Sequence, residues 1–103
     1  MDSIKTAMEI IANAGEAKSN ALTALQKIRQ GEYEEAEKNM ESARQAIIKA
    51  HNLHSELLFY EAEYNDLKVT MLMTHAADHL TSGDIIIELA AEMIYMYKEM
   101  RNV

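Results

Sequence analysis

Three side chains in the second half of the chain have the types and the spacing to carry out chemistry. They are His75, Asp78 and His79, in the run Thr-His-Ala-Ala-Asp-His. On a helix, the two histidines lie four residues apart and share a face, and Asp78 can reach back to His75 from three residues further on. A neutral imidazole is a nucleophile and a metal ligand near pH 7. Nucleophilic catalysis and metal binding are therefore the chemistries to consider.

The same run also admits a purely structural interpretation. Asp78 and His79 are adjacent and point about 100° apart around a helix axis, so one ion cannot easily take all three side chains from a single helix. Both histidines fall in an apolar stripe, where a buried imidazole needs hydrogen-bond partners. Asp78, Ser82, or His54 from across the core could serve as these partners. Spacing alone leaves a catalytic or metal-binding role and a structural role both open.

The composition predicts that only helices position these residues. The chain has 103 residues with no Pro and only 3 Gly, and it is rich in good helix formers. We expect one domain over residues 1–103, folded as an antiparallel three-helix bundle that resembles a spectrin repeat. The first helix is predicted from Ser3, as N-cap, to Gln30, with Gly31 in the left-handed position after it. The second begins at about Glu32, and Asn65-Asp66 is the turn before the third, with Asp66 as a candidate cap.

The first two helices each carry one predicted apolar stripe with steps of three and four residues. Lys18 falls in the stripe of the first helix and is expected where that stripe meets solvent, and Gly15 suggests close approach of another helix. In the first helix the stripe is Ile4, Ala7, Ile11, Ala14, Ala21, Leu25 and Ile28. In the second it is Tyr33, Ala36, Met40, Ala43, Ile47, Ala50, His54 and Leu57, continued by Glu61 and Tyr64.

The third helix carries two apolar stripes about 100° apart, which is more than the edge of a lone small bundle needs. We therefore expect self-association along this helix; the alternative is a single bundle that wraps it more deeply. One stripe is Leu72, His75, His79, Ser82, Ile86, Leu89, Met93, Met96 and Met100. The other is Met73, Ala76, Leu80, Gly83, Ile87, Ala90, Ile94 and Tyr97.

Composition excludes several functional classes and argues against others. With no cysteine, the chain has no disulfide, no thiolate nucleophile and no Cys-ligated zinc. Its apolar runs are far too short for a membrane span, and no basic-plus-apolar export signal begins it, so we expect a soluble, cytoplasmic protein without direct membrane insertion. The formal charge is −7, and the basic residues are scattered singly. That pattern argues against a nucleic-acid partner and favours a basic protein surface.

Four segments together resemble one known family. These are Gly31–Ala36, Ala50-His51, Glu56-Leu57 and His75–Leu80, and the similarity extends back to Asn13–Ala17. They look like the lactose/cellobiose-type (lactose/N,N′-diacetylchitobiose family) IIA component of the bacterial phosphoenolpyruvate-dependent sugar phosphotransferase system. The family signature is His-Ala-Gln-Asp-His-Leu, and the chain matches it except for Ala where Gln is usual.

The resemblance implies a cytoplasmic phosphocarrier that works as a homotrimer, its nine helices forming one bundle. It implies that His75 accepts a phosphoryl group from phospho-HPr and passes it to a cysteine of the IIB component, for uptake of a β-disaccharide such as cellobiose, chitobiose or lactose. It also implies that Asp78 from three subunits meets a divalent metal, commonly Mg²⁺, one per trimer. His79, one turn beyond His75, could donate a hydrogen bond to the phosphoryl oxygens.

Two departures from the family pattern keep other functions open. Ala77 removes a polar side chain that the family usually places beside the nucleophile, and Gly83-Asp84 is expected to loosen the helix beyond the site. The rival interpretations are a non-catalytic interaction or metal-binding module that uses His75 and His79 as ligands, and a degenerate regulatory relative that no longer transfers phosphate. His51 is expected to be exposed, and the late methionines are expected to be core rather than metal ligands.

Overall fold

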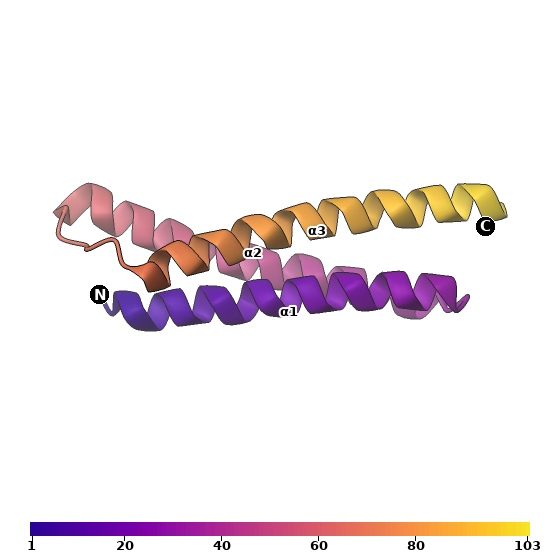
Figure 1. Ribbon diagram of the computed structural model, residues 1–103, viewed down its shortest axis with the longest axis horizontal. Coiled ribbons are helices and arrows are strands. Elements are labelled where there is room, and N and C mark those ends of the chain that lie inside the picture. The colour runs from indigo at the N-terminus through magenta and orange to yellow at the C-terminus, as the bar shows by residue number, and fades with distance from the viewer.

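The computed structural model describes all residues, 1–103, and contains three helices and no strand. They are α1 (Ser3–Arg29), α2 (Tyr33–Tyr64) and α3 (Met71–Arg101). Successive helices run in opposite directions, so that α1 and α3 are parallel and the N- and C-termini lie at opposite ends of the bundle (Figure 1). The bundle measures 54 × 19 × 17 Å. The predicted antiparallel three-helix bundle is confirmed, and no helix combines the length and apolar character needed to cross a membrane.

The helix ends follow local capping chemistry, with two corrections to the predicted caps. Asp2, rather than Ser3, caps α1, and its carboxylate accepts a hydrogen bond from the backbone N–H three residues on at 3.0 Å. Thr70, rather than Asp66, caps α3, because the link after α2 continues as non-helical chain to that residue, whose hydroxyl accepts the equivalent bond at 3.2 Å. Gly31 ends α1 with φ +79°, as predicted.

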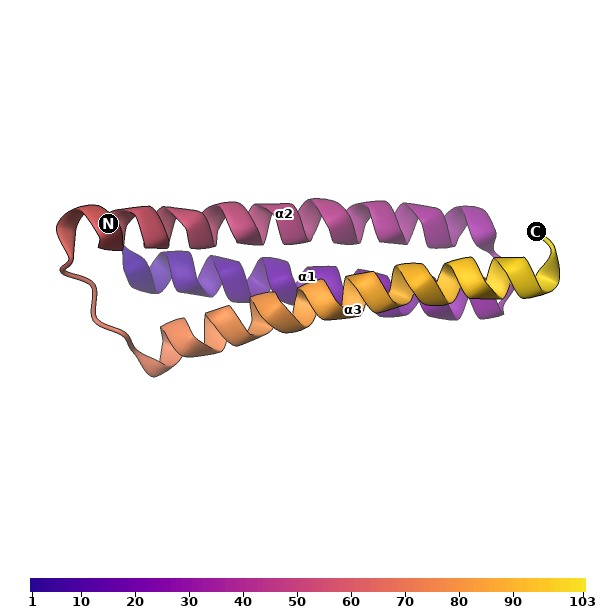
Figure 2. The same cartoon turned by 90° about the horizontal axis from the view of Figure 1, so that it is seen from above.

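A seam of small side chains on α1 forms the centre of the core. α1 packs against both other helices, whereas α2 and α3 contact each other little and diverge at one end (Figure 2). The predicted stripe is partly wrong: Ile4 is 66% exposed and Ile11 is half-buried, while Ile10 is fully buried. The predicted stripe and the buried stripe of α1 have the same period. The buried stripe is Ala7, Ile10, Ala14, Ala17, Ala21, Ala24 and Ile28. The predicted stripe of α2 is confirmed at Ala36, Met40, Ala43, Ile47, Ala50 and Leu57.

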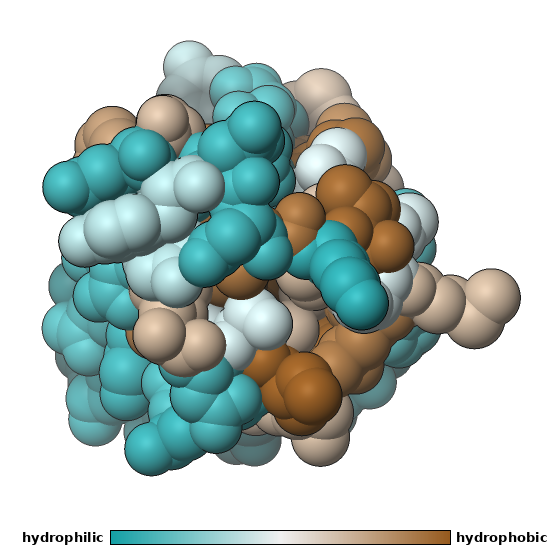
Figure 3. Space-filling model, turned by 90° about the vertical axis from the view of Figure 1, so that its left-hand side faces the viewer, coloured by the Kyte–Doolittle hydropathy of each residue, from teal (hydrophilic) through white to brown (hydrophobic).

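The two apolar stripes of α3 differ in burial. The stripe from Ala76 to Ile94 is buried, whereas Leu89, Met93, Met96 and Met100 of the other are 54, 50, 55 and 84% exposed. The methionines are therefore not core in one chain, contrary to expectation. Seen from the end, apolar surface gathers on one side of the bundle, opposite a more hydrophilic side (Figure 3).

Close helix approach occurs at Gly83, not at Gly15. A Cβ at Gly83 would lie 2.8 Å from the Ile47 Cδ1 atom and 3.6 Å from the Ala14 carbonyl oxygen, while a Cβ at Gly15 would meet nothing within 4 Å. α3 continues as helix through Gly83 and Asp84, and Gly83 is buried, so the expected loosening beyond the site does not break the helix. The missing side chain lets three helices converge at this point.

The two helical glycines should respond differently to alanine. Gly15→Ala should raise the free energy of unfolding by about 1 kcal/mol, since it improves helix propensity without meeting another group. Gly83→Ala should gain little or nothing, because Ile47 must shift, and it should recover the gain in an Ile47→Val background. Urea unfolding at one fixed protein concentration measures all variants. Equal stabilisation by both alanines in the unaltered background would contradict the close approach at Gly83.

Candidate functional site

His75 and His79 lie one turn apart on α3 and contact each other directly. Their Nε2 atoms are 3.0 Å apart, and the rings meet edge to face with centroids 4.4 Å apart. His75 is exposed and His79 is half-buried. The predicted shared face is therefore confirmed, and the outer ring is the one that another protein can reach.

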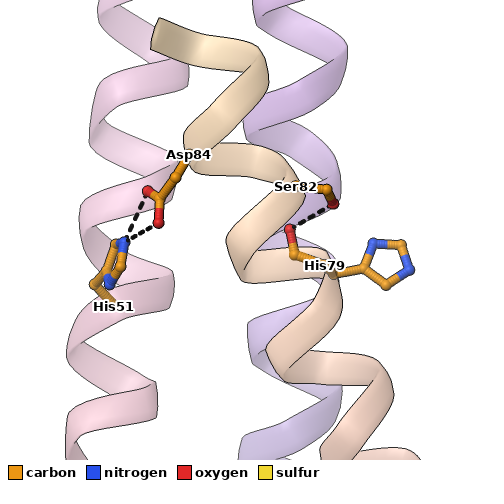
Figure 4. A network of polar contacts seen from close by, with 4 residues as sticks. All are labelled: His51, His79, Ser82 and Asp84. Carbon is orange, nitrogen blue, oxygen red and sulfur yellow. Dashed lines mark hydrogen bonds and ion pairs between the residues drawn. The ribbon is translucent and has the colours of Figure 1, made fainter.

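Lys18 of α1 completes the cluster from the other side of His79. Its Nζ atom lies 2.7 Å from the Nδ1 atom of His79 and donates to the Ser82 hydroxyl at 3.2 Å. Ser82 in turn donates to the His79 backbone carbonyl at 3.1 Å (Figure 4). Lys18 was expected at the edge of its apolar stripe, but its contact with His79 was not predicted. The signal was that Lys18 and Ser82 each interrupt an apolar stripe with a polar group.

These contacts determine which ring nitrogens carry protons. An ammonium group only donates hydrogen bonds, so the Nδ1 atom of His79 accepts and a neutral His79 carries its proton on Nε2. That Nε2–H group then donates to the Nε2 atom of His75. His75 consequently carries its own proton on Nδ1 and presents a lone pair at Nε2.

The electrostatic environment keeps His79 in this neutral form. Burial lowers the pKa of His79, and the Lys18 ammonium and His75 lower it further, against an opposing effect of Asp78. A His with a pKa below its ordinary value is neutral at pH 7. His79 is thus suited to donate one hydrogen bond from a fixed position rather than to carry a charge.

Asp78 does not join this cluster. Its carboxylate is exposed and makes no hydrogen bond within the chain, and no three His, Cys, Asp or Glu side chains of one chain come together as a metal site. Asp78 shares a helix face with Ile85, Leu89 and Met96, which are spaced by seven, four and seven residues and are all exposed. A carboxylate suits a hard divalent cation, but one chain supplies only this single ligand. A complete site would need other copies.

Ala77 lies on a different face of α3 from the histidine pair. It lines a cavity of about 250 Å³ between α2 and α3, together with His54, Glu61, Val69 and Thr74 among others. The expectation that Ala at this position removes a group beside the nucleophile is therefore not met within one chain. Ala in place of Gln at this position therefore changes the face of α3 that lies toward α2.

A second polar pair links α2 and α3 away from the cluster. The Nε2 atom of His51 lies 2.8 and 2.9 Å from the two carboxylate oxygens of Asp84 (Figure 4). His51 is exposed, as expected. His54, a predicted candidate partner of the histidines, lines the α2–α3 cavity instead. The structure therefore brings together His75, His79, Lys18 and Ser82, and leaves Asp78 and His54 outside.

Residues 5–98 match the family described as the lactose/cellobiose-specific IIA subunit of the PTS system. The lichenan-specific phosphotransferase enzyme IIA component of Bacillus subtilis is 35% identical over 92 residues, which cover 89% of this chain and 84% of that protein. The N,N′-diacetylchitobiose-specific EIIA component of Escherichia coli is 32% identical over 94 residues, which cover 91% and 81%.

Solved structures agree with the sequence comparisons. The cellobiose-specific enzyme IIA of Bacillus anthracis superposes with a TM-score of 0.92 at 37% identity, over 99% of this chain and 94% of that one. The IIA(chitobiose) of Escherichia coli, solved in complex with HPr, has a TM-score of 0.84 at 28% identity, over 98% and 99%. The chain therefore belongs to the lactose/cellobiose-specific IIA family of the sugar phosphotransferase system.

Proposed function

We propose that the chain is a phosphohistidine carrier in which His75 accepts a phosphoryl group from phospho-HPr and passes it to a cysteine of a IIB component. The observation that carries this proposal is the arrangement of the two rings. His75 is exposed, and a hydrogen bond from a neutral His79 leaves the lone pair of His75 on Nε2. A family member whose structure was solved in complex with HPr supports HPr as the donor.

Phosphoryl transfer needs little from the protein beyond holding the attacking and leaving groups in line. A bond forms between the Nε2 atom of His75 and phosphorus while the bond from phosphorus to the donor atom breaks, and its electron pair leaves with the donor. The Nε2–H group of His79 is freed from His75 as the new bond forms, and it can donate to a phosphoryl oxygen. In the second transfer a cysteine thiolate attacks phosphorus, and the His75 imidazole leaves with the electron pair of the P–N bond.

The sugar of this branch is a β-linked disaccharide under this proposal. Relatives are described as specific for lichenan, lactose or N,N′-diacetylchitobiose, and a solved neighbour as specific for cellobiose. The carrier does not touch the sugar, so its own residues do not distinguish among these. The formal charge of −7 favours docking on a basic surface of a partner protein.

We also propose that three copies assemble into a nine-helix bundle along α3. The exposed stripe of α3 continues into an apolar groove of about 470 Å³ between α1 and α3, lined by Leu22, Leu25, Met93 and Tyr97 among others. Three copies would bring Asp78 from each chain together, with a divalent cation such as Mg²⁺ relieving their mutual repulsion.

The nucleophile can be tested by replacing each ring. His75→Gln keeps a polar side chain of similar size without an imidazole, so it should fold and assemble normally and take up no phosphate from phospho-HPr. His79→Gln keeps a hydrogen-bond donor and should still be phosphorylated at an altered rate. Intact mass of the proteins, with site mapping under alkaline conditions, provides the measurement. Phosphate on His79, or a phosphorylated His75→Gln variant, would show that the assignment is wrong.

Assembly can be tested with a matched pair of substitutions. Leu89 on α3 and Ile48 on α2 are 54 and 58% exposed, so a Glu at either site has a similar effect on one chain. Leu89→Glu would place three charges in the apolar interface and should give monomers, whereas Ile48→Glu should leave a particle of about three times 11.7 kDa. Light scattering at micromolar protein measures the mass. A monomeric unaltered protein would rule out the trimer.

The role of Asp78 can be tested by removing its charge. Asp78→Leu should leave the assembly intact or strengthen it, because apolar contact replaces three converging carboxylates. Thermal unfolding should also lose any dependence on chelator that the unaltered protein shows, while Glu88→Leu, on another exposed face of α3, should retain it. Dissociation of the Asp78→Leu protein would mean that Asp78 makes an essential polar contact, and it would contradict the proposed cation site shared by three Asp78 carboxylates.

A further inference from the structure

We propose that Lys18 is a positioning residue for the phosphoryl acceptor: it holds the proton of His79 on Nε2 and thereby keeps the lone pair of His75 on Nε2. The inference rests on the proposed phosphocarrier function for its catalytic meaning. The placement of the protons itself follows from contacts among Lys18, His79 and His75 and does not depend on that function.

The Lys18 ammonium is the one group in the cluster that cannot accept a hydrogen bond. It therefore sets the direction of the other hydrogen bonds. The Nζ atom of Lys18 has three donors and no acceptor, and it lies 2.7 Å from the Nδ1 atom of His79. A bond this short from a charged donor is of the stronger, charge-assisted kind. It forces His79 to accept at Nδ1 and to donate at Nε2. Without Lys18, two neutral rings 3.0 Å apart could exchange the roles of donor and acceptor.

Lys18 is itself held in place from α3. Its ammonium group also donates to Ser82 at 3.2 Å, and Ser82 is fixed by its own bond to the carbonyl of His79. The side chain is half-buried between α1 and α3, so its ammonium group has little freedom to leave the ring. The contact therefore couples the spacing of α1 and α3 to the proton arrangement at His75.

A structural role for Lys18 would not have this consequence. If the aliphatic stem mattered only for packing, Lys18→Met would preserve most contacts, and the tautomers of the two rings would stay as they are. If the ammonium group directs the protons, the same substitution changes the tautomers while the fold is retained. Lys18→Arg keeps a charged donor and should preserve the original arrangement.

Imidazole ¹⁵N chemical shifts of histidine-labelled protein decide between these alternatives. At mildly alkaline pH, the unaltered chain should show His79 with its proton on Nε2 and His75 with its proton on Nδ1. Lys18→Met should reduce the population of this His75 tautomer, and Lys18→Arg should restore it. Lys5→Met is the control, because Lys5 is an exposed lysine on the same helix. Circular dichroism confirms that each variant is folded.

The rate of phosphorylation by phospho-HPr provides the link to function. Lys18→Met should slow the reaction about tenfold, the size of effect expected from losing one hydrogen bond to a charged group. The proposal is overturned if the unaltered protein carries the His79 proton on Nδ1, if Lys18→Met leaves the tautomers unchanged, or if the tautomers change without slower transfer. If the unaltered protein takes up no phosphate while the tautomers respond as expected, the phosphocarrier function is wrong and the placement of the protons stands.

Discussion

The close packing of small side chains along α1 is the constraint on which the rest of the structure depends. Five alanines of this helix are fully buried, and short side chains allow two neighbouring helices to approach the same axis. Because α2 and α3 contact each other little, α1 determines where α3 lies. Gly83 of α3 meets Ala14 and Ile47 at the tightest point. A larger side chain there would push α3 outward or rotate it.

The rotation of α3 decides which of its faces carries function. With Gly83 and Ala76 turned into the core, His75 and His79 lie at the edge of the α1–α3 interface. The side of α1 that faces this edge is the flank that the core does not use, and it contains Lys18. The site therefore forms where the sides of α1 and α3 that do not face the core lie next to each other. The half-buried His79 imidazole is fixed there by its neighbours, while the His75 imidazole stays accessible to a partner.

The environment of His79 separates the roles of two rings that have the same chemistry. Burial and a neighbouring ammonium group both disfavour an imidazolium, and the pKa of His79 is lowered for these reasons. A neutral, immobilised donor is better suited to orient a neighbouring ring than to act as a nucleophile itself. The apolar stripe that continues along α3 from this point remains uncovered in one chain.

The helices and the functional pair could be predicted from the sequence because both depend on local spacing. The absence of Pro, the Gly31 and Asn65 turns and the three-and-four periodicity predict three long helices, and a four-residue step puts His75 and His79 on one face. The cap of α3 could not be predicted, since Asn65, Asp66 and Thr70 are all residue types that cap helices, and only the structure shows that the helix begins after Thr70.

Periodicity identifies stripes but cannot choose among stripes with the same period. On α1 the flank with Ile10 and the flank with Ile11 are equivalent in spacing, and on α3 both stripes are apolar over most of their length. Only packing against neighbouring helices decides which is buried, because that depends on the shapes that face each other, as at Gly83. The contact of Lys18 with His79 joins residues 61 positions apart, so it exists only once α1 and α3 are side by side. The sequence by itself thus determined the helices and the pair of rings, and the tertiary structure decided which ring is held and which is free.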